Sequence, residues 1–299
     1  MKMKILILGS SGFLGQILTK DLKKIKNFKI FHNGINFKKV DLTNIAYLEK
    51  IILKSDPDIL INCCGLTNLN ICEINKKLSK KLNYEIIKNI FHIKKKRKLF
   101  YKVIHFSSDQ LYDAKNKSGN TEKNKIFLNN QYSKDKYKAD KLASKNGSLI
   151  LRINFFGYSA TKKGFLNWVY DSFLQKKKFY LFNDVFFNPI GISTLSKIIR
   201  RLIFIISIKK KTAGIYNIGA KDGIYKNDLA IYFAKKTHIF NNNFESLGVN
   251  EINNSVKKSK NMFMNVSKFE KKFNIKLPSI KKEISHESKN FLKYAYKNR

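Results

Sequence analysis

The sequence is poor in cysteine, proline and acidic residues. Its 299 residues include 3 cysteines and 3 prolines, and 21 acidic residues stand against 60 lysines and arginines. The cysteines, Cys63, Cys64 and Cys72, lie close together without a second cluster, which excludes a disulfide framework and a paired CxxC zinc site. The 5 histidines are dispersed. We therefore expect a reduced, cytoplasmic protein with no metal site.

Long apolar runs are also missing. The longest, within residues 202–208, is far shorter than the roughly 20 residues that span a bilayer. The apolar stretch near the N-terminus is only as long as a buried strand and does not follow the pattern of a secretory signal. The sequence predicts neither a membrane span nor export.

The formal charge of +39 is typical of proteins that bind polyanions. Here the lysines are scattered through every expected element, and Lys, Asn, Ile, Phe and Tyr are abundant together, as expected when an AT-rich genome biases codon choice. A polyanion site needs a clustered basic face with stacking or base-reading groups. We therefore expect no nucleic-acid partner, although a basic surface helps to attract negatively charged nucleotides.

Glycine is scarce, with 14 residues, yet three glycines lie at intervals of three in Gly9-Ser10-Ser11-Gly12-Phe13-Leu14-Gly15. The apolar run Ile5-Leu6-Ile7-Leu8 precedes them and a helical pattern follows. Glycines in such a turn let the backbone approach a pyrophosphate, and the first amides of the next helix face its charge. This pattern predicts a dinucleotide-binding site.

Strand-like and helical segments alternate through the first half, which indicates a doubly wound, mostly parallel α/β sheet of the Rossmann type. The expected strands are 4–8, 28–31, 39–41, 59–62, 102–106, 148–153 and 215–218, and the expected helices 13–25, 45–53, 78–92, 131–145, 165–175 and 193–206. Beyond residue 226 we expect polar helices and loops. We predict an NAD(P)-binding domain over 1–157 and a smaller substrate domain over 158–299, with elements near 192–218 returning to the sheet.

Tyr132 and Lys136 lie four residues apart on an expected helix and therefore share a face. An ammonium beside a phenol stabilises the phenolate and lowers its pKa, so that the phenol can give a proton to a carbonyl oxygen. Four other Tyr-x-x-x-Lys pairs occur, including Tyr137 with Lys141. Position favours Tyr132, because its helix follows the strand 102–106, and catalytic groups gather beyond the carboxyl ends of parallel strands.

Ser108 follows that same strand. A serine there is often only a turn or helix cap. With Tyr132 downstream, we interpret its hydroxyl as the group that holds a substrate carbonyl toward the tyrosine.

Several motifs in order along nearly the whole chain resemble the extended short-chain dehydrogenase/reductases, and within them the dTDP-4-dehydrorhamnose reductase group. They are G-S-S-G-F-L-G at 9–15, V-D-L-T at 40–43, D-P-D-I-L-I-N-C-C-G-L-T-N at 56–68, Cys72-Glu73, H-F-S-S-D-Q-L-Y-D at 105–113, Tyr132 to Lys136, L-R-I-N-F-F-G at 151–157, F-F-N-P-I at 186–190 and G-I-Y-N-I-G at 214–219.

The resemblance implies that NADPH or NADH binds at the glycine turn, with a nucleotide-sugar as substrate. The implied catalytic residues are Ser108, Tyr132 and Lys136. The implied cofactor-binding residues are Gly9, Ser11, Gly12, Phe13, Leu14, Gly15, Asp41, Leu42, Cys63, Cys64, Gly65, Tyr132 and Lys136. The implied substrate-binding residues are Ser108, Tyr132, Phe155, Asn188 and Lys258.

The chain departs from the family pattern at several positions. Ser108 stands where threonine is common, which keeps the hydroxyl. Cys63 and Cys64 stand where alanines are usual, and we interpret them as packing residues. Lys258 lies in the stretch where the family often carries an Arg-Pro pair, and lysine lacks the bidentate fork of arginine.

No acid follows the second expected strand, where NAD-specific sites place one for the ribose. The site is therefore expected to accept NADPH as well as NADH, with His32, Lys38 or Lys39 as candidate phosphate contacts, and a preference for NADPH is a hypothesis.

The sequence thus predicts an NAD(P)H-dependent enzyme that reduces the 4-keto group of a deoxy-nucleotide-sugar. The resemblance points to conversion of dTDP-4-dehydro-L-rhamnose to dTDP-L-rhamnose for surface polysaccharide. Two alternatives stay open: an epimerase or dehydratase of the same fold with tightly bound NAD, and a non-catalytic nucleotide-binding subunit. The sequence leaves a homodimer open as well.

Overall fold

The structure is a computed structural model that describes residues 2–33, 41–116, 118–161, 164–175, 178–209, 211–251 and 256–297. Contacts divide the chain into two compact units. Unit 1 comprises Met1–Ser108, Leu128–Arg152 and Ile199–Tyr216, and unit 2 comprises Asp109–Phe127, Ile153–Ile198 and Asn217–Arg299. The chain therefore passes between the units more than once, and the domain boundary near residue 157 stays a prediction.

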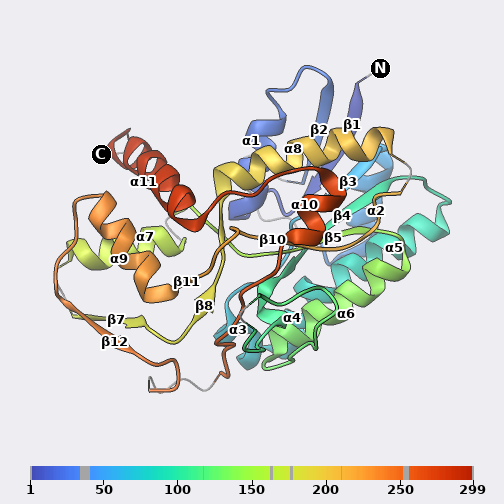
Figure 1. Ribbon diagram of the computed structural model, residues 1–299. Coiled ribbons are helices and arrows are strands. Elements are labelled where there is room, and N and C mark those ends of the chain that lie inside the picture. The colour runs from blue at the N-terminus through green and yellow to red at the C-terminus, as the bar shows by residue number, and fades with distance from the viewer. Residues whose placement is uncertain are drawn as a thin grey trace. The chain divides into compact units, whose positions relative to one another are not determined.

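Unit 1 is built on a six-stranded sheet in the order β10-β5-β4-β3-β1-β2 (Figure 1). The strands are β1 (Met3–Leu8), β2 (Phe28–His32), β3 (Ile59–Asn62), β4 (Lys102–Ser108), β5 (Leu149–Ile153) and β10 (Gly214–Ile218). β1 pairs in parallel with β2 and β3, and β3 pairs in parallel with β4. The mostly parallel α/β sheet predicted from the sequence is confirmed.

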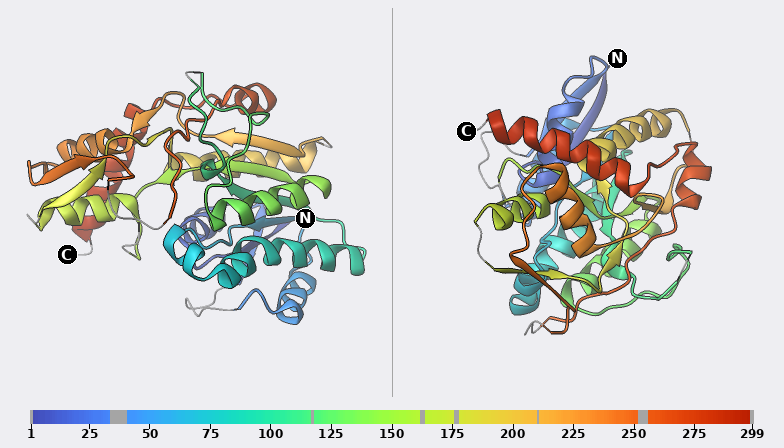
Figure 2. Two further views of the ribbon diagram at one scale, coloured as in Figure 1. Left: turned by 90° about the horizontal axis from the view of Figure 1, so that it is seen from below. Right: turned by 60° about the vertical axis from the view of Figure 1, so that its left-hand side comes forward.

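Helices cover both faces of this sheet (Figure 1). They are α1 (Phe13–Leu22), α2 (Ile45–Ser55), α3 (Leu69–Ile74), α4 (Lys76–Lys80), α5 (Ile86–Lys96), α6 (Gln131–Lys145) and the second half of α8 (Ile192–Ile208). On one face, apolar side chains of α2, α5 and α6 form a core with Leu6, Leu60 and Val103. The left view of Figure 2 shows α5 and α6 side by side there. α1 and α8 lie on the other face, where Phe204 packs on Phe28.

Unit 2 has its own aromatic core. Its elements are β6 (Phe155–Phe156), α7 (Phe165–Leu174), β7 (Phe179–Phe182), β8 (Phe186–Phe187), β9 (Ile190–Gly191), β11 (Ile224–Tyr225), α9 (Lys226–Lys236), β12 (Phe244–Leu247), α10 (Ser267–Phe273) and α11 (Ile280–Lys297), with the first half of α8. Phe291 of α11 packs against Tyr170 of α7 and Phe233 of α9. The right view of Figure 2 shows α11 lying along α9.

Two expectations about local structure need correction. The strand 102–106 continues to Ser108, so this serine ends the strand rather than following it. The single helix expected over 78–92 is α4, a π-helical turn at Lys81–Glu85 and α5. The elements that were not expected are α3, β6, β7, β8, β9, β11 and β12. The strand expected at 39–41 lies almost wholly outside the described residues.

Within the described part of the chain, no helix is both long and apolar enough to cross a membrane.

Candidate active site

The glycine turn predicted to hold a pyrophosphate joins β1 to α1. Gly9 has a φ of +77°, and a Cβ there would lie 2.8 Å from the backbone at Cys63 and Cys64. A Cβ on Gly15 would lie 2.2 Å from the carbonyl oxygen of Gly9, so helix and turn pack too closely for a side chain. These two glycines are thus required by the geometry of the turn.

The start of α1 is open for an anion. Gly12 is the residue before the helix and offers no side chain to cap the first amides. Ser11 and Gly12 are exposed. Backbone amides at an uncapped helix start form a site that suits phosphate groups. The turn therefore fits the pyrophosphate of a dinucleotide.

Asn33, just after β2, holds this turn in place. Its Oδ1 accepts hydrogen bonds from the amides of Gly9 at 2.8 Å and Ser10 at 3.2 Å, and from Ser10 Oγ at 3.2 Å. Asn33 is buried. Sequence reasoning searched this region for an acid and missed the amide that organises the turn.

A second backbone segment, Cys63 to Leu66, follows β3. Asn62 Oδ1 accepts from the amide of Cys64 at 3.1 Å. Asn83 Oδ1 accepts from the amide of Leu66 at 3.0 Å, and its Nδ2 donates to the Leu66 carbonyl at 3.1 Å. Asn83 lies in the π-helical turn, an irregularity that often marks functional sites. Two buried asparagines thus fix the segment where Cys63, Cys64 and Gly65 are predicted to contact cofactor.

Two residues of this segment, Cys63 and Cys64, carry thiols that form no disulfide. Burial raises the pKa of Cys63 well above its usual range and that of Cys64 to about 12. Both remain protonated at neutral pH and are poor nucleophiles. This agrees with their interpretation as packing residues.

The predicted catalytic groups lie at β4 and α6. Ser108 is the last residue of β4, and Tyr132 and Lys136 lie one turn apart at the start of α6. All three are buried. Lys136 Nζ donates to the carbonyl oxygen of Phe106 at 2.5 Å, which connects α6 to the carboxyl end of β4 two residues before Ser108.

Burial and a neighbouring carboxylate together set the pKa of Lys136. Burial lowers its pKa to about 8, while the carboxylate of Asp140 acts in the opposite direction. Asp140 is held by Arg152, whose Nε lies 3.0 Å from Asp140 Oδ2, and both residues are buried. A lysine pKa near neutrality together with burial is a feature that functional sites often share.

The first turn of α6 is fixed by a polar network. Asn130 Oδ1 accepts from the amide of Ser133 at 2.9 Å, while Ser133 Oγ accepts from the amide of Asn130 at 3.2 Å, which forms a capping box. Glu73 of α3 accepts from the amide of Gln131 at 2.9 Å. The buried Asp135 accepts from Ser79 Oγ at 2.8 Å. These contacts fix the first turn of α6, which carries Tyr132.

His105 is a buried residue of β4 whose ring is only half paired. Asn62 Nδ2 donates to its Nδ1 at 3.1 Å, which assigns the ring proton to Nε2. Among the described residues, Nε2 has no hydrogen-bond partner. Burial, assisted by the charge of Lys136, lowers the pKa of His105 well below its usual range, so the ring is neutral.

The predicted adenosine region is partly described. Asp41 Oδ1 accepts from Thr43 Oγ1 at 2.6 Å and from its amide at 2.9 Å, and these bonds lower the pKa of Asp41. Leu42 is buried. His32 lies at the end of β2, with Lys23 Nζ 3.0 Å from its Nε2, which adds a cation that sequence reasoning missed. Lys38 and Lys39 lie outside the described residues.

Of the predicted substrate residues, Ser108 and Tyr132 belong to unit 1, and Phe155, Asn188 and Lys258 belong to unit 2. Phe155 is half-buried in β6. Asn188 is buried, and its Nδ2 donates to the carbonyls of Ala220 at 2.7 Å and Met264 at 2.9 Å, so its amide protons hold the backbone together. Lys258 is half-buried, with Nζ 4.8 Å from the ring centroid of Phe182.

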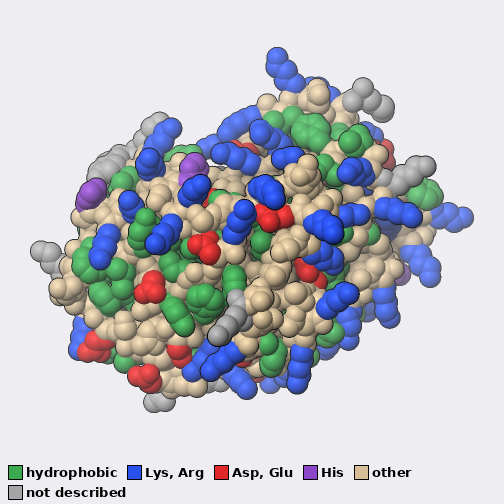
Figure 3. All heavy atoms as spheres, in the orientation of Figure 1, with side chains coloured by type: hydrophobic (Ala, Val, Ile, Leu, Met, Phe, Trp, Pro, Cys, Tyr) green, Lys and Arg blue, Asp and Glu red, His purple; other side chains and the backbone are tan. Residues whose placement is uncertain are grey.

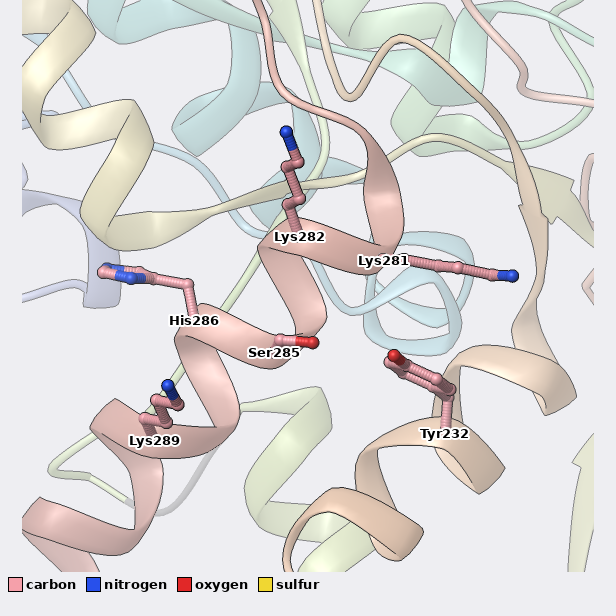
Figure 4. A pocket seen from close by; sticks show the side chains of 6 residues that line it. All are labelled: Tyr232, Lys281, Lys282, Ser285, His286 and Lys289. Carbon is pink, nitrogen blue, oxygen red and sulfur yellow. The ribbon is translucent and has the colours of Figure 1, made fainter.

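A pocket of about 450 Å³ in unit 2 contains none of the predicted residues. It is lined by Tyr232, Lys281, Lys282, Ser285, His286 and Lys289. Figure 4 shows Lys281 and Lys282 pointing away from each other, and His286 and Lys289 on the opposite side of α11 from Tyr232. Its cations do not converge, so the pocket offers no focused anion site.

Comparison with known proteins identifies the family. A sequence model of the RmlD substrate binding domain family matches residues 3–292. The chain belongs to this family. A dTDP-4-dehydrorhamnose reductase of Escherichia coli is 22% identical over 292 residues, 92% of this chain and 94% of that protein. A probable low-salt glycan biosynthesis reductase of Haloferax volcanii is 21% identical over 196 residues, 61% of this chain and 65% of that protein. The latter match spans less than two thirds of the relative.

Solved structures agree with the RmlD fold. A dTDP-4-dehydrorhamnose reductase from Bacillus anthracis in complex with NADP has a TM-score of 0.85 at 18% identity, covering 96% of this chain and 99% of that one. A hypothetical dTDP-4-dehydrorhamnose reductase from Sulfolobus tokodaii has a TM-score of 0.76 at 27% identity, covering 90% and 94%. The family resemblance stated from sequence motifs is confirmed. The role of each site residue stays a prediction.

Proposed function

We propose that this RmlD-family protein reduces the 4-keto group of a deoxy-nucleotide-sugar with NADPH or NADH. The substrate we propose is dTDP-4-dehydro-L-rhamnose, which gives dTDP-L-rhamnose as a precursor of surface polysaccharide. The observation that carries this proposal is the hydrogen bond from Lys136 to Phe106, because it brings the Tyr132 helix to the strand that ends in Ser108. Membership of the family and the open glycine turn support it.

Each of the three residues has a distinct task in this mechanism. When bound at the glycine turn, NADPH or NADH would be the source of the hydride that reduces the carbonyl carbon. Ser108 Oγ donates a hydrogen bond to the carbonyl oxygen and orients it. Tyr132 gives its phenolic proton to that oxygen as the alcohol forms. The ammonium of Lys136 stabilises the resulting phenolate until solvent returns a proton.

The residues of unit 1 also fit the cofactor. The turn Gly9 to Gly15 would hold the pyrophosphate, and Lys136 would hold the ribose of the nicotinamide. The end of β2 carries Asn33 instead of an acid, with His32 and Lys23 nearby. A cationic end of β2 favours a ribose phosphate, so we propose a preference for NADPH. A higher kcat/KM with NADH would contradict that preference.

The test of the proposed activity is an NADPH oxidation assay with a panel of 4-keto-6-deoxy nucleotide sugars. We expect stoichiometric NADPH oxidation with at least one of them, and a purified protein that exchanges its cofactor freely. Absence of oxidation across the panel would contradict the proposal. Stoichiometric NAD that co-purifies and is regenerated in each turnover would favour an epimerase or dehydratase instead.

The cytoplasmic location and the homodimer stay predictions. Light scattering of the purified protein at working concentration measures the oligomeric state directly.

A further inference from the structure

Two lysines of unit 2 lie against one phenylalanine ring. Lys226 Nζ is 5.5 Å from the ring centroid of Phe182 and 5.2 Å from that of Phe165. Lys258 Nζ is 4.8 Å from the centroid of the same Phe182. The residues come from α7, the end of β7, the start of α9 and the segment after residue 256. Folding therefore gathers two ammonium groups from distant parts of the sequence.

The position of Lys226 is fixed by its backbone. It is the first residue of α9, and its amide donates to the carbonyl of Val185 at 2.9 Å. Its side chain and that of Lys258 are both half-buried. This placement differs from that of the many fully exposed lysines on the chain.

Neither ammonium has an acidic partner within ion-pair distance among the described residues. By contrast, Lys260 lies two positions from Lys258 and pairs with Asp184 at 2.6 Å. The carboxylate of Asp109 raises the pKa of Lys226, yet its Oδ2 already accepts from Asn154 Nδ2 at 2.6 Å. Among the described residues, Asp109 is thus the one carboxylate that acts on these two ammonium groups.

This arrangement is unfavourable without a ligand. Burial and the charge of Lys258 lower the pKa of Lys226 to about 8, and burial lowers that of Lys258. A cation–π contact stabilises a protein only modestly at exposed sites. A single exposed lysine can make such a contact, as Lys235 does with Phe240 at 5.0 Å. Cation–π contacts alone do not explain why two like charges lie at one ring. A bound anion would explain it, because its negative charge offsets the repulsion between the two ammonium groups.

We propose that Lys226 and Lys258 together bind the diphosphate of a nucleotide ligand, one ammonium for each phosphate. This inference rests on the proposed function and adds to it Lys226, which no sequence motif indicates. Lysine contacts phosphate as a point charge and lacks the bidentate geometry of arginine. Two lysines can therefore contact both phosphates of a diphosphate, which a single ammonium group cannot do as well.

The test is calorimetric titration with dTDP and with inorganic pyrophosphate. We expect Lys226→Gln and Lys258→Gln each to weaken dTDP binding about tenfold or more, and the affinity for NADPH to stay within about twofold. Lys226→Arg keeps the charge and should bind dTDP within about threefold of the wild type. Lys235→Gln is the matched control, because it removes a lysine of the same helix that also lies on a phenylalanine ring. Thermal unfolding verifies that each variant folds.

The outcomes separate this inference from the proposed function. Unchanged dTDP binding by Lys226→Gln, or an equal loss in Lys235→Gln, would overturn the two-lysine site and leave the reductase proposal standing. A wild type that bound none of dTDP, UDP and GDP would overturn both. If Lys226→Gln did not fold, a tenfold loss in the folded Lys226→Arg would equally contradict the inference.

Discussion

At the scale of single residues, the account depends most on Tyr132. Replacing it with phenylalanine removes the phenolic proton and leaves the ring. Because general acid catalysis contributes about 10²–10⁴-fold, we expect kcat to fall at least a hundredfold. The dissociation constant for NADPH, measured by fluorescence, should change by less than about threefold. Tyr137→Phe, on the same helix, should retain the wild-type rate. An undiminished rate in Tyr132→Phe would remove that residue from the mechanism.

Lys226 predicts a pH dependence of binding. Its pKa is lowered to about 8, so the ammonium is present below pH 8 and is lost above it. The affinity for dTDP should therefore fall as the pH rises from 7 to 9. Lys226→Arg should flatten this profile, because the guanidinium stays protonated. Titrations at several pH values measure the difference, and parallel profiles for the two proteins would contradict the assignment.

At the scale of elements, α11 caps the start of α8 with two buried carboxylates. Glu283 accepts from the amide of Gly191 at 2.6 Å and from Thr194 Oγ1 at 2.9 Å, and Glu287 accepts from the amide of Ser193 at 3.0 Å. Burial raises the pKa of both, that of Glu287 from 4.5 to about 7. A helix start favours the charged forms, but burial and mutual repulsion outweigh that effect.

This pair predicts a loss of stability with rising pH. The folded protein binds the Glu287 proton more tightly than the unfolded chain, so its contribution is complete below pH 4.5 and lost through pH 7. Between pH 5 and pH 8, the free energy of unfolding of the wild type should fall by about 2 kcal/mol more than that of Glu287→Gln, because the variant has no carboxyl proton to release. Denaturant melts at both pH values measure this. Glu245→Gln, which removes an exposed ion pair with Lys178, is the control and should respond to pH as the wild type does. If Glu287→Gln lost as much stability as the wild type between the two pH values, the prediction would be refuted.

The elements that could be predicted from sequence carry local signals. The helix expected at 131–145 has the observed bounds, since its capping box and periodicity lie within a few residues. The glycine turn is equally local. Asn33 and Asn83 were missed because their partners lie 24 and 17 residues away. β12 was missed because its partner, β7, comes much earlier in the chain. Lys226 was not singled out from the sequence, because only folding places it on the Phe182 ring that Lys258 also contacts.

At the scale of the whole molecule, the charge of +39 determines how ligands approach. On the face shown in Figure 3, lysine and arginine side chains are spread widely, with acidic side chains among them. This dispersal agrees with the expectation of no nucleic-acid partner, which stays a prediction. Retention on heparin should match that on a cation exchanger of equal charge, and selective retention on heparin would contradict it.

The same charge predicts a salt dependence of catalysis. A positive molecule attracts an anionic nucleotide-sugar, and salt screens this attraction because the Debye length falls to about 8 Å at 0.15 M. We expect kcat/KM to fall several-fold between 20 and 300 mM salt, while kcat at saturation changes little. Stopped-flow and steady-state rates measure both. A kcat/KM independent of salt would show that the surface charge has no role in association.

The central claim is that hydride passes from cofactor to a sugar carbonyl while Tyr132 supplies the proton. The most direct measurement uses NADPH deuterated at the transferred position, dTDP-4-dehydro-L-rhamnose and mass spectrometry of the sugar product. We predict one deuterium at the former carbonyl carbon, matched mole for mole by NADP formed, and at most about one hundredth of that rate in Tyr132→Phe. Product without deuterium, or NADPH left unchanged while the sugar is converted, would contradict the account.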